Sequence, residues 1–332
     1  MRNSGKARGL LKSICTIACA AILLFTLLGV SAYGQLKIAA VYLIPAVDGG
    51  FCETLHRGLT AAAGTYGYDY AFSENVSTAD AEGALRGYAE RGYNIIFAHT
   101  TGYKAAVERV APDYPNVLFA LFAGSTGAPN VVMYDWYGNE ACYLLGVIAG
   151  MTTATNTIGH IGGMKVPNQL RYLAGFIAGV KSVNPDAQLP SVFTGSFTDA
   201  AAGKEVATTL LEQGADVLFD TMGLAWIGVK DLTAEMGGHI LADYGYKAAN
   251  APEVILAGQV VYYDKLLEQL IADRDAGTLK PQYWASLANG MLDILYSGSA
   301  GQVIPYVVRT QVEKAKQEII SGAVVVPMTM TP

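Results

Sequence analysis

The chain has 332 residues, 52% of them hydrophobic, and a formal net charge of −6 at pH 7. This length suits one large domain or two medium-sized ones with a substantial core. The acidic balance argues against nucleic acids and anionic membrane surfaces as partners, because both attract basic proteins.

Residues 1–34 have the pattern of a cleaved secretory signal peptide. Four basic residues precede an apolar run from about Ile14 to Val30, and Ala32 and Gly34 put small residues at the positions that signal peptidase reads. The alternative is an uncleaved membrane anchor, because the apolar run is nearly long enough to span a bilayer. Cleavage would leave 298 residues with a net charge of about −10.

Only two cysteines, Cys52 and Cys142, follow the leader. In an oxidising compartment they could form one disulfide, and the alternative is two buried thiols. There is no CxxC motif and no Cys/His cluster at metal-ligand spacing, so the sequence predicts neither a metal site nor a cofactor.

Strand-like and helix-like patterns alternate along the chain. In the first half, strands are predicted at 36–44, 68–75, 93–100, 116–124 and 130–136, with helices from Cys52 to Tyr66, up to Arg91, and over 102–115. In the second half, strands are predicted at 156–164, 189–197, 215–223, 239–245 and 253–262. The helices there run over 140–152, 168–184, 199–214, 226–237 and 263–276. Two such βαβα blocks predict an α/β fold with two doubly wound parallel sheets.

Ligands of doubly wound sheets bind beyond the carboxyl ends of the strands, and two facing lobes form a cleft there. Three loops at such ends carry aromatic and polar residues that suit a flat, polar ligand: Asp48 with Phe51, then Thr100 with Thr101, then Phe197. Two aromatics from opposite lobes could sandwich a ring. Each residue also has a structural alternative, such as Phe51 packing into the core or Thr100 capping a helix.

Later loops add Met222, Trp226 and Asp243 to the candidate pocket. An aspartate at a strand end can accept hydrogen bonds from ring N–H groups or ribose hydroxyls, although a lone aspartate is more often a helix cap or turn residue. No G-x-S-x-G or H-E-x-x-H motif is present, and the four histidines form no catalytic pattern. We therefore predict no catalytic residue and favour binding over turnover.

Several segments resemble the basic membrane protein family of ABC-transporter solute receptors, which includes purine-nucleoside-binding proteins. The matching segments span roughly residues 36 to 327, and "GVKSVNPD" and "GSFTDAAAGKEVATTLLEQGADVLF" are the most specific of them. The resemblance implies a two-lobed type I periplasmic-binding fold that captures its ligand by lobe closure. It also implies a cytoplasmic ATPase and a permease as partners, and places the mature protein in the periplasm.

The resemblance maps the family's purine-stacking aromatics onto Phe51 and Phe197, and its aspartates onto Asp48 and Asp243. Two positions depart from nucleoside-binding members: Gly245 replaces a second aspartate, and Val261 replaces a lysine. These departures leave a free base such as adenine, or another flat heterocycle, as the alternative to a nucleoside.

The sequence thus predicts a monomeric, non-enzymatic periplasmic receptor for a purine-type ligand. One lobe would comprise residues 35–136 and 260–288, and the other 137–258 and 289–332. The first alternative is a sensory module that presents its ligand to a signalling receptor. The second, a nucleoside-cleaving enzyme, would need a positioned carboxylate and access for water.

Overall fold

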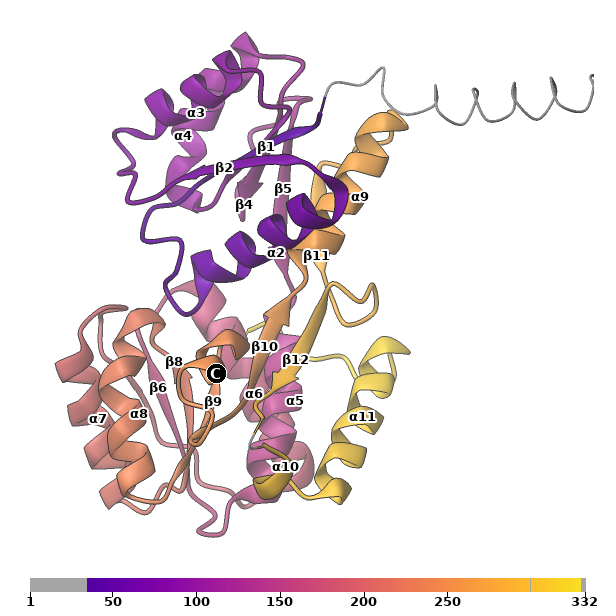
Figure 1. Cartoon of the computed structure of the whole chain (residues 1–332). Helices are drawn as coiled ribbons and strands as arrows, with labels where there is room; N and C mark the ends of the chain where they lie inside the picture. Colours follow the sequence, from indigo (N-terminus) through magenta and orange to yellow (C-terminus); the bar gives the residue numbers. More distant parts are fainter. Residues whose placement is uncertain (1–34, 299, 330–332) are drawn as a thin grey trace, which may run out of the picture.

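A computed structural model describes residues 35–298 and 300–329 and shows two α/β lobes (Figure 1). Each lobe is built on one six-stranded sheet flanked by helices. This architecture confirms the fold class predicted from the alternation of strands and helices. The predicted signal peptide, residues 1–34, lies outside the described residues.

The sheet of the first lobe is parallel throughout, with the strand order β11-β5-β4-β3-β1-β2. The strands are β1 Lys37–Val41, β2 Asp69–Ser73, β3 Ile95–Ala98, β4 Leu118–Phe122, β5 Val131–Trp136 and β11 Gln282–Ala285. The helices are α2 Phe51–Tyr66, α3 Ala81–Glu90, α4 Lys104–Val110 and α9 Tyr263–Asp275, with 3-10 turns η1 Thr101–Tyr103 and η2 Ala111–Asp113.

Helices cover both faces of this sheet, which explains its continuous apolar strands. In β1, Ile38 and Ala40 pack in the layer of α2 and α9, while Ala39 and Val41 pack in the layer of α3 and α4. Side chains of a strand alternate between the two faces of the sheet. When helices cover both faces, the side chains on either face are buried, so most of them are apolar.

The sheet of the second lobe has the order β12-β10-β9-β8-β6-β7 and is parallel except for β12 against β10. The strands are β6 Ile158–Gly162, β7 Ser191–Phe193, β8 Val217–Thr221, β9 His239–Ala242, β10 Ile255–Val261 and β12 Leu292–Tyr296. The helices are α5 Gly138–Thr152, α6 Pro167–Val183, α7 Ala200–Glu212, α8 Ile227–Glu235, α10 Ala300–Val303 and α11 Tyr306–Ile320, with 3-10 turns η3 Gly223–Trp226 and η4 Gly245–Ala249.

The chain passes between the two sheets after β5, after β10 and between β11 and β12. These passages are tied together, because Tyr137 N donates to the Ala285 carbonyl at 2.9 Å and Tyr262 N donates to the Met291 carbonyl at 2.8 Å. Three connections, rather than a single linker, therefore join the lobes, and we call them the hinge region. The lobe boundaries drawn from the sequence stay a prediction.

Some predicted element ends were wrong. The apolar run 36–44 is a strand only to Val41, and the strand predicted at 189–197 covers only Ser191–Phe193. The helix predicted over 102–115 is a short α-helix between two 3-10 turns, and Pro112, which has no N–H to donate, lies in the second of them. No element had been predicted after residue 276, where β11, β12 and α11 lie.

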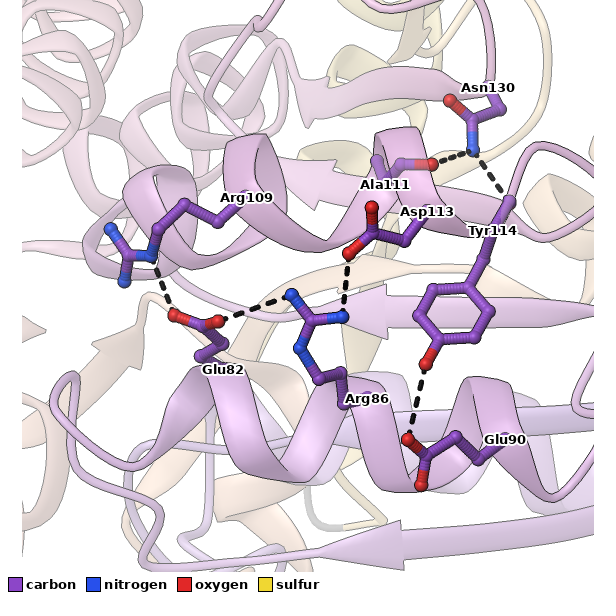
Figure 2. A network of polar contacts seen from close by, with 8 residues as sticks. All are labelled: Glu82, Arg86, Glu90, Arg109, Ala111, Asp113, Tyr114 and Asn130. Carbon is purple, nitrogen blue, oxygen red and sulfur yellow. Dashed lines mark hydrogen bonds and ion pairs between the residues drawn. The ribbon is translucent and has the colours of Figure 1, made fainter.

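A surface network joins α3 to the end of α4 on the outer side of the first lobe (Figure 2). Glu82 accepts hydrogen bonds from Arg109 at 2.6 Å and from Arg86 at 3.3 Å, and Arg86 also contacts Asp113 at 2.7 Å. Solvent screens such pairs, so the network aligns the two helices and contributes little to stability.

Cys52 and Cys142 are both buried and both free, so the thiol alternative holds in this structure. Burial raises the pKa of each thiol well above its usual range. Among the described residues, none of the helices combines the length and the apolar character needed to span a bilayer.

Candidate ligand-binding site

The carboxyl ends of the two sheets face each other, and one glycine loop of the first lobe touches the second lobe directly. A Cβ on Gly49 would lie 3.3 Å from Trp226 Nε1, and a Cβ on Gly50 would lie 2.7 Å from Tyr244 Cδ2. Gly49 also has a φ of +73°, which side chains disfavour. The loop therefore needs glycines both for its turn and for the close approach of the lobes.

Asp48 is buried at the start of this loop and caps the first helix. Its carboxylate accepts hydrogen bonds from the backbone N–H groups of Gly50 at 2.9 Å, Glu53 at 3.0 Å and Cys52 at 3.2 Å. Burial raises the pKa of Asp48, while these backbone donors lower it. The structural alternative considered for Asp48 is thus present, and its contact with a ligand stays a prediction.

Phe51 is half-buried at the first turn of α2 and packs against an aromatic cluster. Its ring stacks on His99 with centroids 3.9 Å apart and an interplanar angle of 14°. Phe122 contacts it edge-on at 5.0 Å, and Trp136 lies 6.3 Å away. One face of Phe51 is therefore fixed by His99, which orients the ring.

His99 is held as a neutral imidazole. Its Nε2 lies 3.0 Å from the Phe51 carbonyl, which only accepts, so Nε2 carries the proton and donates. Its Nδ1 therefore accepts from the Tyr134 hydroxyl at 2.5 Å. Burial lowers the pKa of His99 to about 3, so the ring that backs Phe51 carries no charge at neutral pH.

The second predicted stacking residue, Phe197, lies after β7 in the second lobe. A Cβ on Gly163 would lie 2.2 Å from Phe197 Cδ1, and one on Gly223 would lie 3.1 Å from the Phe197 carbonyl oxygen. Two glycines thus make room for this half-buried aromatic residue. Phe51 and Phe197 are not in ring contact with each other in the described structure.

Two further predicted residues are on the surface of the first lobe. Thr100 is partly buried and its hydroxyl caps η1 by accepting from Gly102 N at 3.2 Å, while Thr101 is exposed. Thr100 thus shows the capping contact that was its structural alternative, and a contact with a ligand stays a prediction.

Met222 and Trp226 are buried in the core of the second lobe. Trp226 keeps its indole nitrogen at the loop of Gly49, so it belongs to the boundary between the lobes. Met222 packs beneath α7, with its sulfur 3.2 Å from the position of a Cβ on Gly203. Of these two, Trp226 is the better placed to meet a ligand.

Asp243 takes part in a buried charge cluster that the sequence reasoning missed. Lys247 Nζ lies 2.7 Å from Asp243 Oδ1 and 2.6 Å from Asp220 Oδ2, and all three residues are at most 1% exposed. Burial raises the pKa of Asp243, and Lys247 opposes that rise. Burial alone would lower the pKa of Lys247, but the two carboxylates raise it, so the lysine stays charged.

The spacing of Asp243 and Lys247 was the available signal, since residues four apart can meet on one helical turn. Asp48 of the first lobe lies close enough to act electrostatically on both of them. Asp48 of the first lobe therefore interacts with the charge cluster of the second lobe where the two lobes meet. Within the described residues no three His, Cys, Asp or Glu side chains are arranged to hold a metal ion.

The family model described as "ABC transporter substrate-binding protein PnrA-like" (Bmp) matches residues 36–279. The chain belongs to the Bmp family. The resemblance recognised from the sequence motifs is thereby confirmed, and the family is one of ABC-transporter substrate-binding proteins.

Curated Bmp-type relatives include a nucleoside-binding protein, BmpA of Lactococcus lactis, which is 27% identical over 79% of this chain and 79% of its own length. A purine-binding protein of Brucella abortus is 30% identical over 58% of this chain and 56% of its own length. The chain spans about half the length of several curated relatives that it matches, for example 46% of an antigen from Listeria monocytogenes.

A solved solute-binding protein of an ABC transporter from Conexibacter woesei shares the fold. It aligns with a TM-score of 0.79 at 23% identity and covers 89% of this chain and 99% of its own. At that identity the likeness concerns the fold alone.

Proposed function

We propose that the Bmp-family chain is the periplasmic receptor of an ABC importer and binds a purine-type ligand, a nucleobase or a nucleoside, between its lobes. The observation that carries the proposal is Phe51, an aromatic ring at the boundary between the lobes that His99 backs on one face. A ring fixed in this way is suited to stack a flat heterocycle on its other face, with Phe197 as the partner from the second lobe.

The charges at the boundary support the same ligand class. Asp48, Asp220 and Asp243 offer three carboxyl groups to one ammonium, Lys247, so a ligand that donates hydrogen bonds suits the excess of acceptors. Purine N–H groups and ribose hydroxyls are such donors. The same excess opposes a phosphorylated ligand, so we expect nucleotides to bind more weakly than nucleosides.

The family and two of the relatives, one nucleoside-binding and one purine-binding, add independent support. In this proposal, residues 1–34 direct export and are removed. The mature monomer then closes on its ligand and presents both lobes to the permease, which works with a cytoplasmic ATPase. Thr100, Thr101, Met222, Trp226 and Asp243 complete the proposed pocket. The protein releases its ligand unchanged and performs no chemistry on it.

The test is binding to protein that has been unfolded and refolded to remove any carried-over ligand. Calorimetry and melting temperatures are measured with adenine, hypoxanthine, adenosine, inosine, AMP, sugars and amino acids, because a ligand of the folded state stabilises it by mass action. We expect purine compounds to bind, and Phe51→Ala and Phe197→Ala each to lose about 1–3 kcal/mol of affinity, as for a stacked base.

The matched control is Tyr306→Ala, which removes a surface ring of α11 that is 84% exposed. Its affinity should equal that of the wild type. Binding only to sugars or amino acids, or purine affinities unchanged in both Phe variants, would refute the stacking site. Release of free base from a nucleoside at catalytic amounts of protein would favour the enzyme alternative instead.

A further inference from the structure

Three buried side chains where the lobes join have polar atoms without a hydrogen-bond partner among the described residues. The atoms are Trp136 Nε1, Tyr172 Oη and both amide atoms of Gln259. Trp136 and Gln259 are each 1% exposed and Tyr172 is 0% exposed. Buried polar groups in proteins are nearly always paired, so a cluster of unpaired ones points to a partner outside the chain.

The three side chains come from different elements but meet at one place. Trp136 ends β5 of the first sheet, Gln259 lies in β10 of the second, and Tyr172 is in α6. A Cβ on Gly138 would lie 2.2 Å from Tyr172 Cε1 and 3.0 Å from Gln259 Oε1. The rings of Trp136 and Tyr172 lie nearly parallel with centroids 6.4 Å apart. The unpaired atoms therefore form one polar cluster on the hinge side of the lobe boundary.

This cluster adjoins the proposed stacking site. The Trp136 ring lies 6.3 Å from that of Phe51, the residue proposed to stack on the ligand ring. On the other side, Tyr172 is close enough to Asp243 for the two to interact electrostatically. A ligand ring on Phe51 would thus have its substituents within reach of the cluster.

The surroundings of the cluster are electrically neutral. Arg171 Nη2 contacts Asp135 Oδ1 at 3.0 Å on one side of the cluster, and Asp243 on the other side is paired with Lys247 at 2.7 Å. Arg171 also lies near the Tyr172 hydroxyl, but the hydroxyl forms no hydrogen bond of acceptable geometry with a described residue. A neutral environment of this kind favours an uncharged group over an ion.

The unpaired atoms of the cluster determine which hydrogen bonds the ligand group must form. Trp136 Nε1 only donates, the Gln259 amide offers both donors and an acceptor, and the Tyr172 hydroxyl can do either. A partner must therefore accept and donate at several adjacent atoms. Neighbouring hydroxyl groups, as on a sugar ring, meet this requirement because every hydroxyl both donates and accepts, whereas each polar atom on the rim of a purine does only one of the two.

We propose that Trp136, Tyr172 and Gln259 form a second subsite, the hinge-side subsite, which hydrogen-bonds a neutral hydroxyl-bearing substituent of the ligand. This inference rests on the proposed function. It predicts that a glycosylated heterocycle binds more tightly than the bare one because of Trp136, Tyr172 and Gln259, and not because of Asp243. It also explains why three polar groups are kept in an otherwise aromatic region.

The first test uses Tyr172→Phe and Gln259→Met, which remove polar atoms and keep the shape of the side chain. The matched control is Tyr103→Phe, because Tyr103 is equally buried and its hydroxyl donates to the Val76 carbonyl at 2.6 Å. In ligand-free protein, Tyr103→Phe should lower the melting temperature by a few degrees, whereas Tyr172→Phe and Gln259→Met should leave it unchanged or raise it. An equal fall for Tyr172→Phe would show that its hydroxyl has a partner within the protein, and would overturn the subsite.

The second test measures calorimetric affinities of the same variants for adenosine, adenine, D-ribose and D-glucose. We expect each subsite variant to bind adenosine about tenfold more weakly, the effect of one hydrogen bond, and adenine within about twofold of wild type. An equal loss for adenine and adenosine, or no loss for either, would overturn the subsite while the purine proposal stands.

The remaining outcomes separate the two proposals. If the wild type binds a sugar and no purine, the purine proposal fails, and weaker sugar binding by the two variants still supports the subsite. If the wild type binds adenine but gains nothing from the ribose of adenosine, the subsite fails and stacking stands. If it binds none of the four compounds, both proposals are refuted.

Discussion

Replacing Lys247 with methionine tests the buried charge cluster of the second lobe. The change removes an ammonium that lies 2.6 Å from Asp220 and 2.7 Å from Asp243, and leaves both carboxylates buried without their counter-ion. Removing one partner of a buried ion pair costs about 3–5 kcal/mol. We expect the free energy of unfolding to fall by that amount, and the melting temperature by on the order of 10 °C.

The loss should depend on pH in a defined direction. Burial raises the pKa of Asp243 and Lys247 opposes that rise, so the variant should have a still higher Asp243 pKa. A carboxyl group with a raised folded-state pKa holds a proton that the unfolded chain releases, so stability falls as pH rises from the unfolded pKa, about 4, through the folded one. The difference between variant and wild type should be largest near pH 8 and shrink toward pH 5.

Urea unfolding followed by circular dichroism at pH 5, 6.5 and 8 measures these differences. Lys204→Met, at an exposed position of α7, is the control and should change stability by no more than about 0.5 kcal/mol. Adding Asp220→Asn and Asp243→Asn to the lysine variant should recover part of the loss, because neutral groups are cheaper to bury. A loss below about 1 kcal/mol, or one that is the same at all three pH values, would refute the description of the cluster as a buried, charged group.

Three further predictions concern closure, pH and thiol chemistry. Gly50→Ala places a methyl group 2.7 Å from the Tyr244 ring, so we expect at least tenfold weaker ligand binding in calorimetry with little change in melting temperature; unchanged affinity would mean that the two lobes need not approach this closely. Burial lowers the pKa of His99 and of His160 to about 3, so stability should fall as pH decreases from about 6.5 toward 3, and His160→Gln should flatten that fall in urea titrations. Cys142 should resist a thiol reagent in the folded protein and react on unfolding, because burial raises its thiol pKa; rapid labelling of native protein would contradict this.

Much of the fold could be predicted from the sequence because local patterns and tertiary environment agree. The strands of both sheets are buried on two faces, so they appear as apolar runs such as the one containing β1. The loop before Phe51 was recognisable from its glycines and its position between strand and helix. The family motifs added the two-lobed arrangement, which no single segment of the chain determines.

The parts that sequence reasoning missed depend on contacts distant in the chain. Lys247 was overlooked because lysine is normally exposed, and its burial is explained by Asp220, 27 residues away. The edge strand β11 is short and only partly apolar, and it is a strand because β5 pairs with it. The unpaired atoms of Tyr172 and Gln259 could not be predicted either, since a sequence does not show which polar groups lack hydrogen-bond partners.

The interleaving of the two sheets also sets an order of events during synthesis. The first sheet lacks its edge strand β11 until residue 285 has been made, well after β5 is complete and most of the second lobe has emerged. Until then the open side of β5 has backbone groups with no strand beside them, and the nascent first lobe cannot reach its final stability. The first lobe therefore begins at the amino end of the described chain but is completed only near the end of synthesis, after most of the second lobe.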